Sequence, residues 1–311
     1  MTNVSFDSVK PPLSINTLQT IENEFRFNSM TPVQAATLPL FLSHKDVCVE
    51  ATTGSGKTLA FAIPTLEILL RRDPPLSKFD VGALIVAPTR ELAKQIYEVV
   101  TKLVNGVYNI EINTKSNDEN DKKRHKHQKL SVMSLIGGSS IDHSIKELQK
   151  SGGNIIIGTP GRIMDIINRS SNNNNCNNNN NNSDRFILNL KALEVLVLDE
   201  ADTLLDMGFK EEISQILAAL PKQRRTGLFS ATQTVEVREL ARAGMRNPVT
   251  VRVRVQMTSQ QQLELHQKQQ LKQKQQVSSS HKGNDNKDDN DDEDNDDDSE
   301  DHIEGIEHLQ H

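Results

Sequence analysis

Short segments of uniformly apolar residues recur along the first 253 positions, and this recurrence limits the possible folds more than any other feature. Most of these segments lack the alternation of polar and apolar residues that a strand with one solvent-exposed face shows. They therefore indicate strands covered on both faces, as in a parallel sheet. The predicted strands are residues 47–50, 81–87, 132–136, 154–157, 193–198, 227–229 and 249–253.

Segments with helical periodicity fill the intervals between these strands. Thr89 is expected to cap one such helix. Another is expected to end at Pro221, and the helix that begins near residue 57 is expected to end near residues 71–75. The alternation of strand and helix predicts an α/β fold with a doubly wound parallel sheet. The apolar face of the helix capped by Thr89 is made by Leu92, Ile96, Val99, Val100 and Leu103.

A glycine-rich turn follows the first predicted strand and leads into a helix. Backbone N–H groups in such a turn point toward bound phosphates, and the amino terminus of the helix attracts negative charge. Lys57 can reach the outer phosphates of a nucleoside triphosphate, and the Thr58 hydroxyl can bind Mg²⁺. Taken alone, such a turn is more often only a turn. The predicted nucleotide-binding residues here are Ala51, Thr52, Thr53, Gly54, Ser55, Gly56, Lys57 and Thr58.

A second strand, residues 193–198, ends in a pair of carboxylates. Asp199 is placed for the metal side of a nucleotide site, and Glu200 is placed to orient or activate the attacking water. An Asp-Glu pair at a strand end is more often a solvated helix start. The two strand ends in this order, however, predict binding of a nucleoside triphosphate with magnesium.

Charge is distributed unevenly along the 311 residues. The net charge is −6, but residues 285–311 carry −13 and the first 284 residues carry +7. A mildly basic body with an acidic tail fits a nucleic-acid partner. The two cysteines, Cys48 and Cys176, lack metal-ligand spacing and indicate a reducing compartment. No apolar run reaches the length of a membrane span and no signal-peptide core is present, so no membrane partner is expected.

Three polar segments interrupt or follow the α/β pattern. Residues 113–129 have mixed charge, and residues 172–182 are ten asparagines around Cys176. Such sequences bury too little apolar surface to fold, so low-complexity insertions are expected near 113–129 and 170–183. We predict one domain over residues 1–255 and a disordered tail over 256–311. The acidic part of that tail is expected either to keep the chain soluble or to compete with a nucleic acid for the basic body.

Five further motifs lie at or after predicted strands. Singly, each is an ordinary turn, helix cap or packing site. In this order and context they resemble the DEAD-box ATP-dependent RNA helicases, over about residues 6 to 253. Phe27, seven residues before Gln34, resembles the family's adenine-reading segment. The five motifs are Pro88-Thr89-Arg90-Glu91-Leu92, Gly137-Gly138, Thr159-Pro160-Gly161-Arg162, Asp199-Glu200-Ala201-Asp202 and Ser230-Ala231-Thr232.

The resemblance implies a RecA-like P-loop domain that uses ATP and Mg²⁺. Phe27 would stack on adenine and Gln34 would hydrogen-bond its edge. Asp199 would bind the metal through water, with Thr58 and Lys57 on the phosphate side, and Glu200 would be the catalytic base. The residues that would grip the RNA backbone without base specificity are Pro88, Thr89, Arg90, Gly137, Gly138, Thr159, Pro160, Gly161 and Arg162. Those that would couple the nucleotide to the RNA are Asp202, Ser230, Ala231 and Thr232.

The sequence departs from the general P-loop at one position and from the family pattern in two respects. Ala51 replaces the glycine of a general P-loop, as this family often does, and Arg26 replaces the glycine before the adenine-reading aromatic. No His-Arg-x-Gly-Arg segment, which supplies arginine fingers in the family's second domain, occurs after residue 253. The chain is therefore expected to be a fragment, or a shortened product, that lacks this second domain.

The predicted function is an ATP-dependent RNA helicase in ribosomal RNA processing. Residues 31–40 and 221–234 look most like the nucleolar subgroup that acts in large-ribosomal-subunit assembly, which implies pre-ribosomal particles as partners and the nucleus and nucleolus as location. A nucleotide-gated RNA-binding or scaffold module without unwinding activity remains an alternative. An unrelated P-loop kinase or GTPase is disfavoured, because the Asp-Glu-Ala-Asp and Ser-Ala-Thr motifs have no role there.

Overall fold

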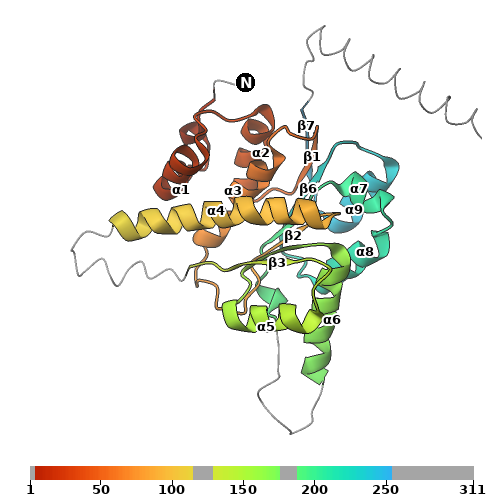
Figure 1. Cartoon of the computed structure of the whole chain (residues 1–311). Helices are drawn as coiled ribbons and strands as arrows, with labels where there is room; N and C mark the ends of the chain where they lie inside the picture. Colours follow the sequence, from red (N-terminus) through yellow and green to blue (C-terminus); the bar gives the residue numbers. More distant parts are fainter. Residues whose placement is uncertain (1–3, 115–128, 176–187, 254–311) are drawn as a thin grey trace, which may run out of the picture. The chain divides into compact units, whose positions relative to one another are not determined.

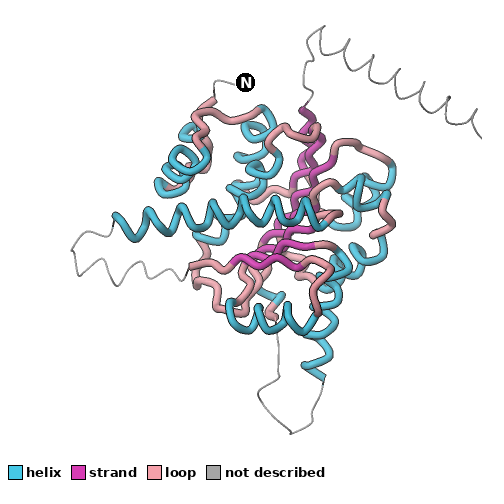
Figure 2. Tube along the Cα trace, viewed as in Figure 1, coloured by secondary structure: helices cyan, strands magenta, loops and turns pink. Residues whose placement is uncertain are grey.

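The computed structural model describes residues 4–114, 129–175 and 188–253, and within these ranges seven strands form one parallel sheet. The strands make a central layer between helices (Figures 1 and 2). Their spatial order is β3-β4-β2-β5-β6-β1-β7. The predicted α/β fold with a parallel sheet is therefore confirmed. The strands are β1 (Val47–Ala51), β2 (Ala83–Val86), β3 (Val132–Leu135), β4 (Ile155–Gly158), β5 (Val195–Leu198), β6 (Arg225–Ser230) and β7 (Val249–Val253).

All seven predicted strands are present, and their ends differ from the predicted ends by no more than two residues. Uniform apolarity has the expected cause, since successive residues of one strand enter different hydrophobic cores. Ile85 and Val197 belong to the core on one face of the sheet, whereas Leu84 and Leu196 belong to the core on the other. With both faces covered, a central strand has no position that water reaches.

Helices from the first part of the chain cover one face of the sheet, and later helices cover the other (Figure 1). The first face carries α1 (Ile15–Thr20), a π-helical turn (Ile21–Phe25), α2 (Pro32–Leu42), α3 (Lys57–Leu70) and α4 (Arg90–Thr114). The second face carries α5 (Ile141–Ser151), α6 (Pro160–Asn175), α7 (Ala201–Asp206), α8 (Lys210–Ala219) and α9 (Val235–Gly244). Two short 3₁₀ helices lie at Phe6–Ser8 and Leu190–Ala192.

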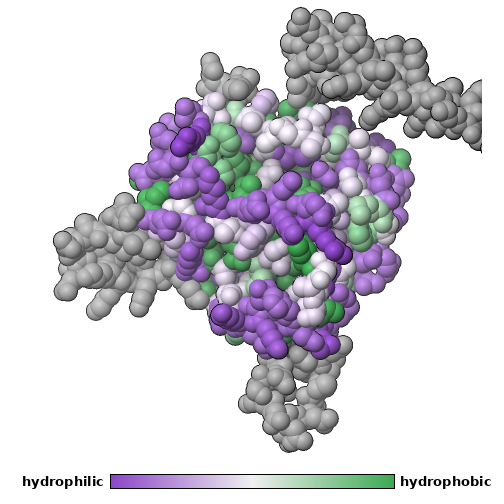
Figure 3. Space-filling view, in the orientation of Figure 1, coloured by the Kyte–Doolittle hydropathy of each residue, from purple (hydrophilic) through white to green (hydrophobic). Residues whose placement is uncertain are grey.

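Helix α4 illustrates how local sequence determines an element. The Thr89 hydroxyl oxygen accepts a hydrogen bond from the Leu92 N–H at 3.2 Å, so the predicted cap is confirmed. Ile96, Val100 and Leu103 are buried against the sheet. The outward side of the helix follows the hydrophilic band that crosses the view in Figure 3. This amphipathic pattern fixes which side of α4 meets the core.

Two helices extend into segments predicted as insertions. Helix α4 reaches Thr114, and α6 reaches Asn175, so the prediction that residues 172–182 do not fold is wrong for residues 172–175. Once a helix is anchored, each further residue adds one backbone hydrogen bond, which favours propagation even into weak helix formers. The rest of both insertions and the predicted tail lie outside the described residues. Within the described ranges, no helix combines the length and apolar character required to cross a membrane.

Candidate nucleotide and RNA site

The predicted site motifs all lie at one edge of the sheet, which we call the carboxyl edge because the strands end there. The phosphate loop follows β1, Asp199 follows β5 and Ser230 ends β6. On the other side of β5, Thr159 follows β4, and Pro88 follows β2. Parallel strands bring all their carboxyl ends to a common edge, which is where open α/β sheets bind ligands.

The phosphate loop is a tight turn that depends on glycine. Gly54 and Gly56 have φ values of 78° and 94°, a region that residues with a side chain rarely adopt. Ser55 donates two hydrogen bonds to the carbonyl oxygen of Thr52, from its N–H at 3.3 Å and from its hydroxyl at 2.7 Å. Helix α3 begins directly after Gly56, so its unpaired N–H groups open onto the loop. The turn thus has the donor geometry that a phosphate group requires.

Lys57 is the first residue of α3, and its side chain is buried. Its Nζ atom donates a hydrogen bond to the carbonyl oxygen of Ala51 at 2.8 Å, which spans the base of the loop. A buried ammonium group requires such partners, because desolvation of an unpaired charge is costly. The strand end and the helix start therefore hold the Lys57 charge inside the phosphate loop.

Asp199 lies at the end of β5 and is buried. Burial raises the pKa of its carboxyl group to about 6, even though the positive charge of Lys57 favours ionisation. One carboxylate oxygen accepts a hydrogen bond from the Glu200 N–H at 3.0 Å. Glu200 has a left-handed backbone, with φ 48° and ψ 55°, which turns the chain from β5 into α7. The two carboxylates are thereby held in different environments, one buried and one partly exposed.

Asp202 connects the Asp-Glu-Ala-Asp motif to the Ser-Ala-Thr motif. Its Oδ2 atom accepts hydrogen bonds from the Ala231 N–H at 3.1 Å, the Thr232 N–H at 2.9 Å and the Thr232 hydroxyl at 2.9 Å. Burial alone would raise its pKa, but hydrogen bonds from Thr232 and Ser230 hold the pKa of Asp202 below its ordinary value. Two segments far apart in the sequence are therefore joined through one carboxylate oxygen.

The segment that is predicted to read adenine contacts the phosphate loop directly. Thr31 and Gln34 form a capping box at the start of α2. The Gln34 side chain accepts a hydrogen bond from the Thr31 N–H at 2.9 Å and donates one to the carbonyl oxygen of Gly56 at 3.2 Å. A Cβ atom on Gly56 would lie only 2.8 Å from Gln34 Nε2. The Gln34 amide still has one N–H and further lone pairs for a base edge.

Phe27 lies at the surface, with 47% of its area exposed, and stacks on Phe25 at 6.2 Å between ring centroids. The π-helical turn Ile21–Phe25 and the left-handed Arg26, with φ 57°, direct the chain into this position. The departure from glycine at position 26 therefore leaves the turn intact. An exposed aromatic face of this kind can accept a planar base.

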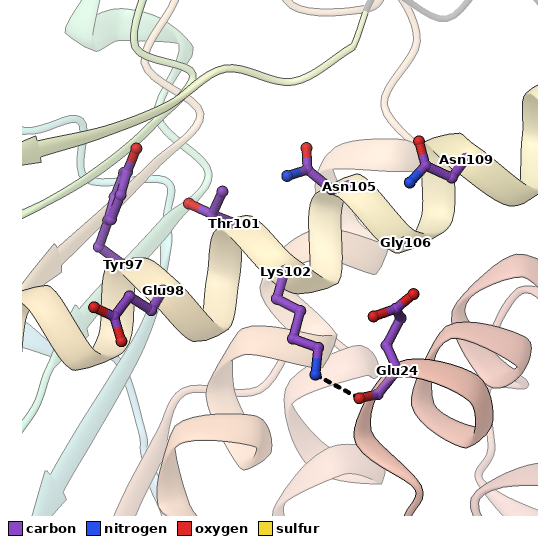
Figure 4. A pocket seen from close by; sticks show the side chains of 8 residues that line it. All are labelled: Glu24, Tyr97, Glu98, Thr101, Lys102, Asn105, Gly106 and Asn109. Carbon is purple, nitrogen blue, oxygen red and sulfur yellow. Dashed lines mark hydrogen bonds between the residues drawn. The ribbon is translucent and has the colours of Figure 1, made fainter.

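A cavity of about 410 Å³ lies behind this segment, between α4 and Glu24 (Figure 4). Lys102 extends from α4, donates a hydrogen bond to the carbonyl oxygen of Glu24, and places its Nζ atom 4.9 Å from the centroid of the Phe25 ring. Both contacts hold the residues that precede Phe27. Helical periodicity does not predict this brace, because Lys102 has the pattern of an ordinary exposed position on an amphipathic helix.

A second cavity, of about 580 Å³, lies at the carboxyl edge beside β2 and β4, and we call it the motif cavity. It brings together seven of the nine predicted RNA contacts. Gly138 and Pro160 do not line it. Gly138 instead lies against the Arg90 guanidinium, and Pro160 is buried. The lining consists of Pro88, Thr89, Arg90, Glu91, Gly137, Thr159, Gly161, Arg162, Asp165, Met207 and Phe209.

The two arginines of the motif cavity differ in their surroundings. Arg90 is exposed, and a Cβ atom on Gly137 or Gly138 would lie 3.0 Å from its guanidinium nitrogens. Arg162 has only 9% of its side chain exposed and donates hydrogen bonds to the Ser139 carbonyl oxygen and the Ser144 hydroxyl. Arg90 is thus free to meet a phosphate, whereas much of the Arg162 side chain braces the loop after β3.

Sequence reasoning missed two apolar residues of the motif cavity. Met207, which is 50% exposed, and Phe209 follow α7 and enter the lining from a separate part of the chain. The sequence signal that could have identified them is the apolar segment Met207-Gly208-Phe209, directly after the helix that begins within the Asp-Glu-Ala-Asp motif. Glu91 and Asp165 add negative charge to the rim.

Comparison with known proteins agrees with this geometry. The sequence model of the family described as DEAD/DEAH box helicase matches residues 31–240. The chain is 48% identical over 255 residues to the ATP-dependent RNA helicase DDX55 of Gallus gallus, and 45% identical over 260 residues to the ATP-dependent rRNA helicase spb4 of Emericella nidulans. These matches cover 82% of this chain but 38% of each relative. The chain thus spans little more than a third of these relatives' length.

Solved structures have the same fold. The crystal structure of a DEAD box protein from Methanococcus jannaschii matches with a TM-score of 0.61 and 33% identity, covering 80% of this chain and 56% of that one. The yeast DEAD-box splicing factor Prp28 matches with a TM-score of 0.62 and 31% identity, covering 79% and 51%. The sheet is accordingly the RecA-like sheet of these proteins. Family match, relatives and fold agree that the chain belongs to the DEAD/DEAH box helicase family, whose named relatives are ATP-dependent RNA helicases.

Proposed function

We propose that this chain is the nucleotide-binding domain of an ATP-dependent RNA helicase that acts on ribosomal RNA. The observation that carries the proposal is the arrangement of Lys57 in the phosphate loop with Asp199 and Asp202 at the same edge, where Asp202 is bonded to Thr232. This arrangement joins a triphosphate site to the segment that follows β6. A binding event at one part can thereby be communicated to another.

The residues present fit a nucleoside triphosphate with Mg²⁺. The loop supplies a tight turn with positive φ at Gly54 and Gly56, in which a Cβ atom on Gly54 would meet only open space, and Lys57 supplies a buried positive charge. Asp199 and the Thr58 hydroxyl supply oxygen donors, the ligands that Mg²⁺ prefers. Asp199 holds the metal partly through water in this proposal. Phe27 and Gln34 offer a stacking face and an amide that match adenine.

Hydrolysis transfers the γ-phosphoryl group of ATP to water. The water oxygen bonds to the γ-phosphorus, and the bond to the bridging oxygen breaks to release ADP. Glu200 orients this water and accepts its proton, and Lys57 stabilises the charge on the outer phosphates. Mg²⁺, when bound, neutralises phosphate charge and orients the oxygens. Asp202, Ser230, Ala231 and Thr232 relay the state of this site.

RNA is proposed to bind along the motif cavity through its sugar-phosphate backbone. Arg90, the N–H groups near Gly137 and the Thr159 hydroxyl are suited to phosphate oxygens, and such contacts position a strand without reading its bases. Since a relative bears the name ATP-dependent rRNA helicase, ribosomal RNA is the proposed substrate. Large-subunit pre-ribosomal particles in the nucleolus are the proposed setting. The proposed contact surface is completed by Pro88, Thr89, Gly138, Pro160, Gly161 and Arg162.

The test measures nucleotide and RNA binding by the 311-residue chain. Fluorescent ADP and ATP should bind with Mg²⁺, and Lys57→Ala should weaken the triphosphate most. Lys146→Ala, an exposed position on α5, removes the same charge and should have no effect. A non-hydrolysable ATP analogue should strengthen binding of single-stranded RNA. Equal binding by wild type and Lys57→Ala would refute the nucleotide assignment.

The alternative, a nucleotide-gated RNA-binding or scaffold module, differs in chemistry. Both functions predict nucleotide-dependent RNA binding, but only the helicase couples hydrolysis to strand separation. Measurement of duplex unwinding by this chain fused after Val253 to the second domain of a related helicase, with Glu200→Gln as the inactive control, separates them. Unwinding that Glu200→Gln abolishes supports the helicase, and tight RNA binding with no unwinding supports the module.

A further inference from the structure

A polar cavity of about 380 Å³ lies at the opposite edge of the sheet, where the strands begin. We call it the basal pocket. Its lining comes from the turn before β1, the starts of β5 and β6 and the turn before β7. None of these segments takes part in the carboxyl-edge site. The lining residues are His44, Glu194, Gln223, Arg225 and Arg246.

Arg225 is the first residue of β6, and its side chain lines the basal pocket. The Nε atom is buried, and its N–H has no hydrogen-bond acceptor among the described residues. A buried donor without an acceptor is destabilising, and more so when it is charged. Arg225 as a whole is partly exposed and lines the pocket, so its guanidinium charge acts on a ligand that enters. The guanidinium of Arg225 is therefore prepared for an anionic or strongly accepting ligand.

Positive charge exceeds negative charge in the basal pocket. Glu194 is the one carboxylate in the lining, and it forms an ion pair and a hydrogen bond with Arg72, which follows the end of α3. Arg72 therefore neutralises it. The buried Asp46, which accepts a hydrogen bond from the Arg246 N–H, is offset by the charge of Arg224, so the charges of Arg225 and Arg246 are left over. Arg246 is exposed at the rim, and its guanidinium donates one long hydrogen bond, at 3.4 Å, to the Arg224 carbonyl oxygen.

His44 lies in the turn before β1, lines the basal pocket and is affected by the same charges. Burial and the charge of Arg225 lower its pKa, with Arg71 acting in the same direction and Glu194 in the opposite direction. These are the charged groups that face the imidazole. Its backbone is left-handed, with φ 61°, so the turn before β1 holds the ring at the pocket. An anion bound here would favour the protonated imidazole.

We propose that the basal pocket binds a backbone phosphate of RNA, as a second RNA contact at the sheet edge opposite the motif cavity. Two guanidinium groups match the oxygens of a phosphate, with which arginine forms bidentate hydrogen bonds. A pocket of this volume also has room for the attached ribose. The second contact would let the domain bind a folded RNA at two edges of the sheet. A single short strand bound in the motif cavity does not require this second contact. This inference rests on the proposed RNA-binding function.

The composition of the lining favours RNA over an acidic protein segment. Protein partners usually anchor a Trp, Tyr or Arg side chain in a well-packed pocket, and the lining of the basal pocket has no large aliphatic, Phe, Tyr or Trp side chain to pack such an anchor. Phosphate contacts need only cations and hydrogen-bond donors. Lys45 and Lys222, next in sequence to His44 and Gln223, are exposed and extend the positive surface around the pocket. This surface suits a polyanion that continues past the pocket.

The experiment measures binding of a fluorescent RNA hairpin with a single-stranded extension over a range of salt concentrations. Arg225→Gln and Arg246→Gln are each expected to weaken binding by roughly 3- to 10-fold near 0.1 M salt and to reduce the salt slope by about 1. Arg169→Gln, which removes the same charge from an exposed position on α6, should leave binding unchanged. Arg90→Gln should weaken binding additively with Arg225→Gln, because the two edges share no contacts.

A second measurement separates phosphate binding in the basal pocket from a general loss of positive charge. Comparison with Arg90→Gln separates it from RNA binding at the carboxyl edge. Inorganic phosphate should raise the pKa of His44, followed by NMR, in the wild type but not in Arg225→Gln. Arg246 is exposed, so its variant should melt as the wild type does. If Arg225→Gln and Arg246→Gln leave the RNA affinity unchanged while Arg90→Gln weakens it, the proposal for the basal pocket is overturned and RNA binding at the motif cavity is not. If these variants bind RNA as the wild type does but bind a phosphopeptide more weakly, the choice of RNA as the ligand would be overturned.

Discussion

Gln34 donates a hydrogen bond from its side-chain Nε2 atom to the carbonyl oxygen of Gly56, 3.2 Å away. The residue proposed to read adenine and the glycine that ends the phosphate loop are therefore in direct contact. The Gln34 side chain also accepts from the Thr31 N–H, so it is held in one orientation before any nucleotide arrives. Such preorganisation reduces the entropy lost on binding.

Gln34→Ala is expected to weaken ADP binding and to remove most of the preference for ADP over GDP. The variant removes the amide that matches adenine, and it also frees the Gly56 carbonyl. Affinities for labelled ADP and GDP in Mg²⁺ provide the measurement. Gln95→Ala, at an exposed position of α4, is the matched control and should leave both affinities unchanged. A Gln34→Ala variant with unchanged ADP affinity and selectivity would contradict the adenine assignment.

Asp202→Ala and Thr232→Val are each expected to lower the free energy of unfolding by about 1 kcal/mol. The hydrogen bonds between these residues are partly exposed, so their net contribution is modest. In a double-mutant cycle the two changes should be coupled by about 0.5 kcal/mol or more. Chemical denaturation of the four proteins measures this coupling. Asp206→Ala, at an exposed position of the same helix, should show no coupling with Thr232→Val.

Arg26→Gly is expected to raise the free energy of unfolding by up to about 1 kcal/mol. Arg26 has φ 57°, a conformation that glycine adopts without steric cost. Arg26→Ala is the matched control, because it removes the side chain and keeps the strain. Thermal denaturation should order the proteins with the glycine variant highest. A glycine variant less stable than the alanine variant would show that the left-handed turn carries no strain.

The Asp199 carboxyl group should make stability depend on pH between about 4 and 6. Its folded-state pKa is about 6, above the usual value of about 3.9. The folded state therefore binds this proton more tightly, so the stabilisation is complete below about pH 4 and is lost as pH rises through about 6. The contribution amounts to roughly 3 kcal/mol. Chemical denaturation of wild type and Asp199→Asn across this range provides the measurement. The free energy of unfolding of the wild type, relative to that of Asp199→Asn, should fall as the pH rises from about 4 to about 6.

The 311-residue chain alone is expected to hydrolyse ATP slowly, with or without RNA. The sequence lacks the arginine-rich segment that resembles the family's arginine fingers, and such a finger contributes about 10³- to 10⁵-fold in rate at phosphoryl-transfer sites. Fusing the second domain of a related helicase after Val253 should restore RNA-stimulated turnover. Glu200→Gln should then abolish it. Rapid RNA-stimulated hydrolysis by the unfused chain would be inconsistent with this expectation.

Most of the fold follows from local features of the sequence. Mostly apolar runs of three to seven residues, with Thr89 and Pro221 at helix ends, predict strands and helices that the structure contains. The carboxyl-edge site also follows, because the motifs come after strands and parallel strands end at one edge. The proposed roles of Lys57 and Asp199 could be stated before any coordinates for this reason.

Other features required the tertiary structure. The periodicity of apolar residues and the alternation of strands and helices can be read along the chain. They suffice to predict a parallel sheet, its helices and the edge at which Lys57 and Asp199 meet. Packing alone brings Gln34 to the phosphate loop, Met207 into the motif cavity and Arg225 to a pocket at the opposite edge. These contacts join segments far apart in the chain, and their formation depends on the side-chain volumes and helix positions between them.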